Sequence, residues 1–242
     1  MSSLLIPVAP FSYTKSRLRD CFSIEELKDF TIAMFKDLGK TLTEVNCFKH
    51  KIIYTNSTEI LELTEIYGLI GIKEVLSDPL KSFDDIIKDF NTIAMEEFNT
   101  TQTVLAFVDL VLITAENFIE IDALLKKNQI VVCPAIQSAG ISILGRNPPD
   151  IIETSFSDPN VPSLVALFNK VKNKKIDNIF IFDSFRAGFD IDLKQDLVLA
   201  YEYLKIFNLT HTEVFKFLKD KLKFTLNKKN PDNNRFFHIT EK

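Results

Sequence analysis

The chain has 242 residues, of which 46% are hydrophobic and 26% charged, and its net charge is −4. These values are typical of a globular protein, and the lack of a basic excess argues against nucleic acid as a partner. The three cysteines and three histidines are far apart in the sequence. We therefore expect neither disulfides nor a zinc site, and a cytoplasmic location. No basic leader and no run of about 18 apolar residues is present, so a membrane segment is not expected.

Short apolar runs alternate with segments of helical periodicity along the chain. In chain order we predict strand 4–6, helix 23–42, strand 51–55, helix 56–67, strand 72–76, helix 83–98, strand 104–108, helix 114–126, strand 130–133, an irregular stretch 134–160, helix 161–171, buried strand 179–182, helix 193–207 and helix 212–224. Ser23 with Glu26 forms a capping box, Asn56 is expected to open the second helix, and Thr114 the fourth.

This alternation predicts an α/β fold with a mostly parallel sheet and helices on both faces. No linker or change of composition divides the chain. We therefore expect one domain over residues 1–226 and a polar, loosely ordered tail over residues 227–242.

Acidic residues follow two of the predicted buried strands. Asp109 ends the strand 104–108, and Asp183 ends the strand 179–182, with Asp190 and Asp192 shortly after it. Ligands bind at the carboxyl ends of strands in open α/β sheets, and Mg²⁺ prefers carboxylate oxygens. Helix capping is the alternative interpretation for Asp109 and Asp192. These acids suggest a divalent-cation site at this edge of the sheet, and both interpretations stay open for Asp109 and Asp192.

A basic pair, Lys15 and Arg17, lies in the loop after the first strand. Such a pair can hold phosphate, although a solvated surface loop is the alternative. The chain contains neither GxGxxG nor a Walker loop, so a bound nucleotide must rely on side chains and metal to neutralise its phosphates.

Three segments in this order, IPVAPFSYTKSRL, FVDLVLI and FDSFRAGFDID, resemble the archaeal 2-phospho-L-lactate guanylyltransferase family, CofC. The resemblance covers about residues 4–205. It implies a nucleotidyltransferase fold similar to the molybdenum-cofactor guanylyltransferases and the GT-A glycosyltransferases. It also implies a homodimer, GTP as a substrate and a place in coenzyme F-420 biosynthesis in methanogens.

The resemblance assigns roles to individual positions. Lys15 and Arg17 match the basic pair of the family and would contact phosphate, and Asp109, Asp190 and Asp192 match its magnesium-binding acids. Three further positions match motifs that would contact substrate, Gly140, Ser142 and Ser155. Lys15, Arg17 and Asp109 are the residues to which we assign catalysis.

The chain also departs from the family pattern. Val111 replaces the proline of an Asp-Leu-Pro-Leu motif, and Ile141-Ser142 replaces Thr-Asn of a Gly-Gly-Thr-Asn motif. Phe83-Asp84 replaces a Leu-Asn pair, and Glu153 replaces a glycine.

The expected reaction is transfer of GMP from GTP to 2-phospho-L-lactate, giving lactyl-2-diphospho-5′-guanosine and pyrophosphate. Two alternatives stay open at this point. A related nucleotidyltransferase could use phosphoenolpyruvate or 3-phosphoglycerate, and a non-catalytic relative could act as a binding or scaffold subunit.

Overall fold

The computed structural model describes residues 1–11, 15–227 and 236–241. Its strands are β1 (Ser2–Val8), β2 (His50–Thr55), β3 (Ile70–Lys73), β4 (Gln102–Ala106), β5 (Ile130–Pro134), β6 (Ile141–Arg146), β7 (Ile179–Ile181), β8 (Leu222–Asn227) and β9 (Phe236–Glu241). Its helices are the 3-10 turn η1 (Ser16–Leu18) and α1 (Ile24–Thr43), α2 (Thr58–Ile66), α3 (Phe83–Glu96), α4 (Ala115–Leu125), α5 (Ser163–Lys174), α6 (Phe185–Gly188), α7 (Lys194–Ile206) and α8 (Glu213–Lys221).

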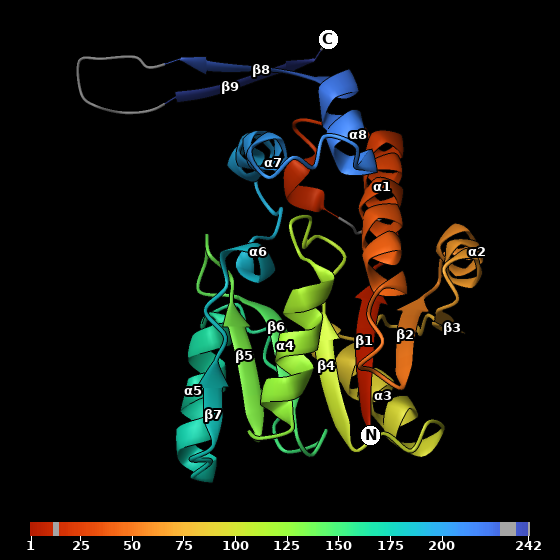
Figure 1. Ribbon diagram of the computed structural model, residues 1–242, viewed down its shortest axis with the longest axis vertical. Coiled ribbons are helices and arrows are strands. Elements are labelled where there is room, and N and C mark those ends of the chain that lie inside the picture. Colours follow the sequence, from red (N-terminus) through yellow and green to blue (C-terminus); the bar gives the residue numbers. More distant parts are fainter. Residues whose placement is uncertain (12–14, 228–235, 242) are drawn as a thin grey trace.

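Within the described residues, seven strands form one sheet in the order β3-β2-β1-β4-β6-β5-β7. Every neighbouring pair is parallel except the two that involve β6, which runs antiparallel to β4 and β5. The parallel strands all end toward the part of the molecule where α7 and α8 lie (Figure 1). The prediction of a mostly parallel sheet is confirmed, and its carboxyl edge faces α7 and α8.

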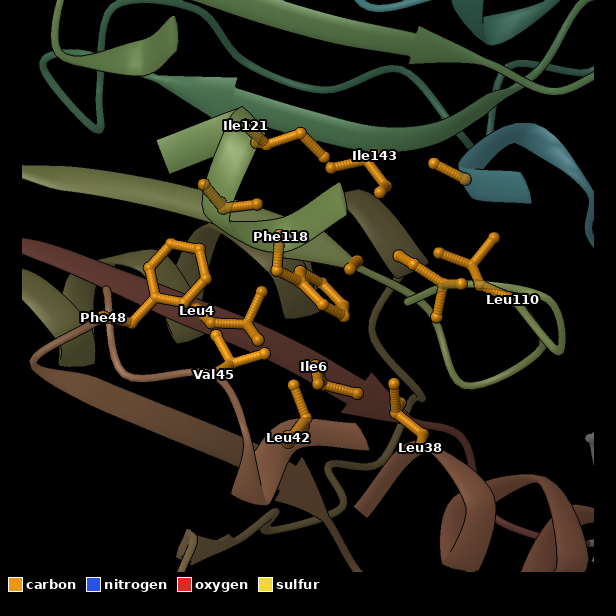
Figure 2. Close-up of a cluster of buried hydrophobic side chains, with 14 of the residues drawn as sticks. Leu4, Ile6, Leu38, Leu42, Val45, Phe48, Leu110, Phe118, Ile121 and Ile143 are labelled. Carbon is orange, nitrogen blue, oxygen red and sulfur yellow. The ribbon is translucent and has the colours of Figure 1, made fainter. Parts of the chain in front are cut away.

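Hydrophobic cores on the two faces of the sheet hold the helices in place. On one face, Phe118 of α4 packs over Leu4 and Ile6 of β1, and Leu38 and Leu42 of α1 close the cluster (Figure 2). On the other face, α3 and α5 cover side chains of β1, β2, β4, β5 and β6. Full burial of one such side chain contributes about 1.5–3 kcal/mol, so these cores hold the sheet edge rigidly.

A third cluster lies beyond the carboxyl edge, between α1, α7 and α8. Phe189 and Ile191, which flank Asp190, are fully buried in it. Leu112, three residues after Asp109, is buried in the same cluster. Two acidic segments that are far apart in the sequence are therefore anchored in one apolar core.

The helix starts confirm two of the three predicted caps. Ser23 with Glu26 and Thr114 with Asn117 form capping boxes at α1 and α4. The prediction for the second helix is wrong by one residue, because the Ser57 hydroxyl, not Asn56, accepts the hydrogen bond from the Ile60 amide.

Three strands of the main sheet differ from the sequence prediction. The third strand, predicted over residues 72–76, is β3 at Ile70–Lys73. The irregular stretch 134–160 contains β6, which is buried at all six positions and lies between β4 and β5. The prolines that follow it made the segment resemble a loop, and the expected strand–helix alternation left no place for an antiparallel strand. The last strand was expected to be buried, but β7 is at the edge, with Ile181 52% exposed.

The chain end also differs from the prediction. The expected helix 212–224 ends at Lys221, and β8 follows and pairs antiparallel with β9. The hairpin extends over α7, away from the main sheet (Figure 1). Residues 236–241 are therefore a strand, and not loosely ordered as predicted.

Residues 228–235 of the tail and residues 12–14 of the first motif lie outside the described part of the chain. No helix among the described residues is long and apolar enough to span a membrane.

Gly188 is a position where the fold leaves no room for a side chain. A Cβ atom there would lie 2.6 Å from the Pro134 carbonyl oxygen, which belongs to the backbone and cannot turn aside. We expect Gly188→Ala to lower the free energy of unfolding by about 1–3 kcal/mol, as overpacking does. Urea unfolding measures this. Gly71→Ala is the control, because its Cβ would meet only movable side-chain atoms of Leu61 and Thr64. Equal stability of both variants would contradict the prediction.

Candidate active site

A cleft of about 340 Å³ opens at the carboxyl ends of β1 and β4. Four of the residues that line it are charged, Lys15, Arg17, Asp109 and Asp192. The others are Pro7, Ala9, Ser16, Phe83, Phe107 and Val108. Folding thus brings together four of the residues that the sequence singled out, from three separate segments of the chain.

Lys15 is the centre of this arrangement. Its ammonium group donates to Asp109, to Asp192 Oδ1 at 2.9 Å and to the Ile191 carbonyl oxygen at 2.5 Å. Its backbone adopts the left-handed conformation, with φ of 46°. Burial alone would lower the pKa of Lys15, but Asp109 and Asp192 outweigh it and hold the pKa above the ordinary value. Lys15 is therefore a charged internal counter-ion, and its three N–H donors are all in use.

Asp109 is held by the core on which its loop rests. Leu110 is 2% exposed and packs near Leu38 (Figure 2), while Leu112 is buried in the cluster under α7. The Val111 amide donates to the Asp109 carbonyl oxygen at 3.0 Å, a bond that a proline could not make. The replacement of proline by Val111 therefore leaves the Asp109 loop anchored.

Asp190 and Asp192 come from the segment before α7. Burial, together with Asp109 and Asp192, raises the pKa of Asp190 to about 7. Burial alone would raise the pKa of Asp192, but Lys15 and Arg17 hold it below its ordinary value. The three acids therefore lie close enough to repel one another, and one lysine does not offset all of the charge.

Asp196 fixes the Asp192 segment and was missed in the sequence. Its Oδ2 accepts hydrogen bonds from the Asp192 amide at 2.9 Å and the Leu193 amide at 2.7 Å. The N-cap position of α7 is Leu193, so the alternative interpretation of Asp192 as the helix cap is wrong. The position of Asp196, three residues after the N-cap, is the sequence signal that could have identified it.

One carboxylate oxygen of the cleft has the chemistry to bind a hard divalent cation. Asp109 Oδ1 is buried and accepts no hydrogen bond from any described residue. A carboxylate oxygen with a free lone pair, next to two further acids, is the type of ligand that Mg²⁺ takes. Among the described residues, no three acidic, cysteine or histidine side chains are arranged so that they could hold a metal ion. Lys15 contacts both Asp109 and Asp192.

Arg17 lies at the mouth of the cleft. Its side chain is 70% exposed, and its Nη1 is 3.8 Å from Asp192 Oδ2. This ion pair is long and exposed to solvent. The planar guanidinium of Arg17 therefore has N–H donors available to bind an incoming phosphate.

The three predicted substrate-contact residues lie outside the lining of this cleft. Ser142 is buried in β6, where its hydroxyl donates to the Gly188 carbonyl oxygen at 3.3 Å. Gly140 lies in the turn before β6, where its amide donates to Ser138 Oγ at 3.1 Å. Ser155 precedes Phe156, whose ring packs against the cleft residues Phe83 and Phe107. Of the three, Ser155 lies next to the aromatic wall of the cleft.

Asp84 holds in place the aromatic wall formed by Phe83, Phe107 and Phe156. The sequence analysis noted this residue only as a departure from the family pattern. Its two carboxylate oxygens accept the amides of Phe156 and Ser157, each at 2.8 Å. Burial alone would raise the pKa of Asp84, but a hydrogen bond from the Thr154 side chain and these two amide bonds hold the pKa below its ordinary value. Asp84 therefore fixes the loop that carries Ser155 and Phe156 onto the start of α3.

We expect Asp84→Asn to loosen this loop, because an amide group offers only one acceptor oxygen for the two backbone amides. The KM for the substrate that contacts the loop should rise about tenfold, the equivalent of one hydrogen bond to a charged group, with a smaller change in kcat. Steady-state kinetics with each substrate varied in turn measures this. Asp85→Asn is the control, since the exposed Asp85 carboxylate accepts a hydrogen bond from the Ser82 hydroxyl and holds no backbone amide of the Ser155 loop among the described residues. Identical KM values for both variants and the unaltered protein would refute this role.

Comparison with solved structures places the protein in the nucleotidyltransferase fold class. A protein from Desulfovibrio desulfuricans G20, provisionally described as a nucleotide-diphospho-sugar transferase, superposes with a TM-score of 0.70 at 13% identity over 90% of this chain and 94% of its own. A nucleotidyl transferase from Methanothermobacter superposes with a TM-score of 0.58 at 12% identity, over 86% and 99%. These likenesses show the fold.

The sequence comparisons identify a family, which is a smaller group of proteins than the fold class. Residues 2–239 match the model of the guanylyl transferase CofC-like family, and the chain belongs to that family. It is similar to 2-phospho-L-lactate guanylyltransferase of Methanocaldococcus sp. FS406-22, with 27% identity over 80% of this chain and 78% of the relative. The Methanocaldococcus jannaschii protein of the same name is 26% identical over 80% of each chain.

Proposed function

We propose that this protein transfers GMP from GTP to 2-phospho-L-lactate, giving lactyl-2-diphospho-5′-guanosine and pyrophosphate for coenzyme F-420 biosynthesis. The observation that carries the proposal is the contact of Lys15 with Asp109 and Asp192 in the cleft of a CofC-like chain. The names of the similar Methanocaldococcus proteins support the choice of substrates.

The reaction needs little acid–base chemistry from the protein. A phosphate oxygen of 2-phospho-L-lactate attacks the α-phosphorus of GTP, and the bond from that phosphorus to the β-phosphate bridging oxygen breaks. The nucleophile is already anionic at neutral pH, so the main barrier is repulsion between two polyanions. Catalysis therefore rests on positioning and on positive charge, as in other phosphoryl-type transfers.

The charged cleft residues and the neighbouring Asp190, which does not line the cleft, divide these tasks. Asp109, Asp190 and Asp192 would hold Mg²⁺, which when bound neutralises phosphate charge and polarises the phosphoryl group. Arg17, with its exposed guanidinium, would bind phosphate directly. Lys15 donates all of its N–H groups to the acids and the Ile191 carbonyl. It would therefore set the position and charge of the acids, and would have to leave one of them to contact phosphate.

The decisive experiment is incubation of the purified protein with GTP, Mg²⁺ and 2-phospho-L-lactate, with mass analysis of the products. Parallel reactions contain phosphoenolpyruvate or 3-phosphoglycerate in place of 2-phospho-L-lactate. The lactyl diphosphoguanosine mass with release of pyrophosphate is expected only with all three components. A product with another acceptor alone would change the substrate assignment, and no product with any acceptor would leave a binding subunit as the better description.

We also propose a homodimer, on the basis of the family resemblance. Light scattering after gel filtration should give about twice the chain mass of 27.7 kDa. A mass of one chain across the concentrations used for the enzyme assay would refute it.

A further inference from the structure

A second pocket of about 260 Å³ adjoins the catalytic cleft. The two cavities share Ala9 and Phe83 as lining residues, so one extended ligand can occupy both. Most of the pocket wall is apolar, with Leu76 and Leu80 at its rim about half exposed. Apolar walls next to a phosphate-binding cleft suit an aromatic ring system, which gains dispersion and hydrophobic contact there.

One carboxylate lies in this apolar wall. Glu74 directly follows β3 and is only 8% exposed. Its backbone amide donates to the Thr55 carbonyl oxygen at 2.8 Å, which fixes its position. Across the part of the chain that the structure describes, the Glu74 carboxylate accepts no hydrogen bond and forms no salt bridge, since nearby Lys81 pairs with Asp89 at 2.5 Å.

The Glu74 carboxylate oxygens have no protein partner but are not fully enclosed, so a ligand in the pocket can reach them. Burial raises the pKa of Glu74, with Lys81 opposing the shift. A ligand that presents two adjacent N–H donors would satisfy both carboxylate oxygens at once. Among the common nucleobases, guanine offers such a pair on its Watson–Crick edge, at N1 and the 2-amino group. Adenine presents an acceptor at N1, and uracil presents a single donor.

We propose that Glu74 recognises guanine, by accepting hydrogen bonds from N1–H and the 2-amino group of the base held in this pocket. Glu74 is thereby the residue that selects the nucleotide. The inference rests on the proposed guanylyl transfer, and it adds the residue that distinguishes guanine from other bases. The base would lie against Leu76, Leu80 and Phe83, and the phosphates would extend past Ala9 toward Arg17 and Lys15.

The test compares nucleotides that differ only at the two donors. Binding of GTP, ITP and 1-methyl-GTP to the full chain is measured by calorimetry with Mg²⁺, and kcat/KM is measured with 2-phospho-L-lactate. ITP lacks the 2-amino group, and 1-methyl-GTP lacks the N1 proton. We expect GTP to bind about 10- to 100-fold more tightly than either analogue, the range typical of one bidentate contact to a base.

The variant Glu74→Gln should lower kcat/KM for GTP about 10- to 100-fold and bring the GTP-to-ITP ratio close to one. Glu62→Gln, at an exposed position on α2, is the matched control and should keep both values. Thermal unfolding checks that the variants fold. The comparison of analogues on the unaltered protein needs no variant, so the test stands even if Glu74→Gln is unstable.

The outcomes separate this inference from the proposed function. Turnover of GTP with an unchanged GTP-to-ITP ratio in Glu74→Gln would overturn the role of Glu74 and leave guanylyl transfer intact. Equal binding of GTP, ITP and 1-methyl-GTP by the unaltered protein would overturn it as well. Tight, Glu74-dependent GTP binding without transfer to any acceptor would support guanine recognition and refute the proposed reaction.

Discussion

Asp109→Asn is expected to lower kcat/KM for guanylyl transfer by about 10²–10³-fold, the usual effect of removing one transition-state electrostatic contact. Asparagine keeps the shape of the side chain, so the Leu110 and Leu112 anchors should hold. It removes the negative charge that faces Lys15 and would face Mg²⁺, and it replaces one acceptor oxygen with an NH₂ group. Pyrophosphate release measured over a range of Mg²⁺ concentrations should show both a lower maximum and a higher Mg²⁺ requirement.

Asp183→Asn is the matched control for this experiment. Asp183 is exposed and does not line the cleft, although it ends the last strand of the main sheet in the same way in sequence. Its variant should retain full turnover. Near-full Mg²⁺-dependent turnover by Asp109→Asn would remove Asp109 from the proposed site.

Lys15→Met should affect both stability and activity. Methionine fills similar volume but leaves Asp109, Asp192 and the Ile191 carbonyl without their shared donor. Breaking a buried ion pair from one side costs about 3–5 kcal/mol, and because Asp192 is half exposed we expect a loss of about 3 kcal/mol. Turnover should fall about 10³-fold, since the acids lose the cation that positions them. Urea unfolding and steady-state kinetics measure the two effects.

Added Mg²⁺ makes this prediction more specific. The three acids of Lys15→Met lack an internal counter-ion, so Mg²⁺ should raise the free energy of unfolding of this variant more than that of the unaltered protein. Lys28→Met is the control, because the Lys28–Glu59 pair lies at the surface, where an ion pair contributes little to stability. Equal stability of the two lysine variants, with no effect of Mg²⁺ on either, would show that Lys15 does not balance the acids.

The class of fold could be predicted because side chains that become buried form local apolar patterns in the sequence. Apolar runs between capped helices predicted the parallel strands. The capping boxes at Ser23 and Thr114 could also be predicted, because each side chain bonds a backbone amide only three residues away. Strand β6 gave no such signal, since its place in the sheet depends on pairing with β4 and β5 across the fold. The exposure of β7 likewise follows from its place at the sheet edge.

The site shows the same division between local and distant signals. Lys15, Asp109 and Asp192 could be identified because each follows a predicted strand or precedes a helix. Glu74 was missed because the sequence extended the third strand from Ile72 through Leu76, whereas β3 ends at Lys73 and leaves Glu74 at the pocket. Asp84 was visible only as a departure from a motif, since its partners, the Phe156 and Ser157 amides, come from a distant loop.

The sequence by itself determined the α/β architecture, the acids and basic residues of the cleft, and the family resemblance, because these depend on residue type and short-range periodicity. Only the packed structure shows that Lys15 donates to Asp109, Asp192 and a backbone carbonyl, and that the largely buried Glu74 reaches the pocket without a protein partner. Which donor meets which acceptor depends on the packing of segments far apart in the chain, and the strand and helix pattern does not encode those distances.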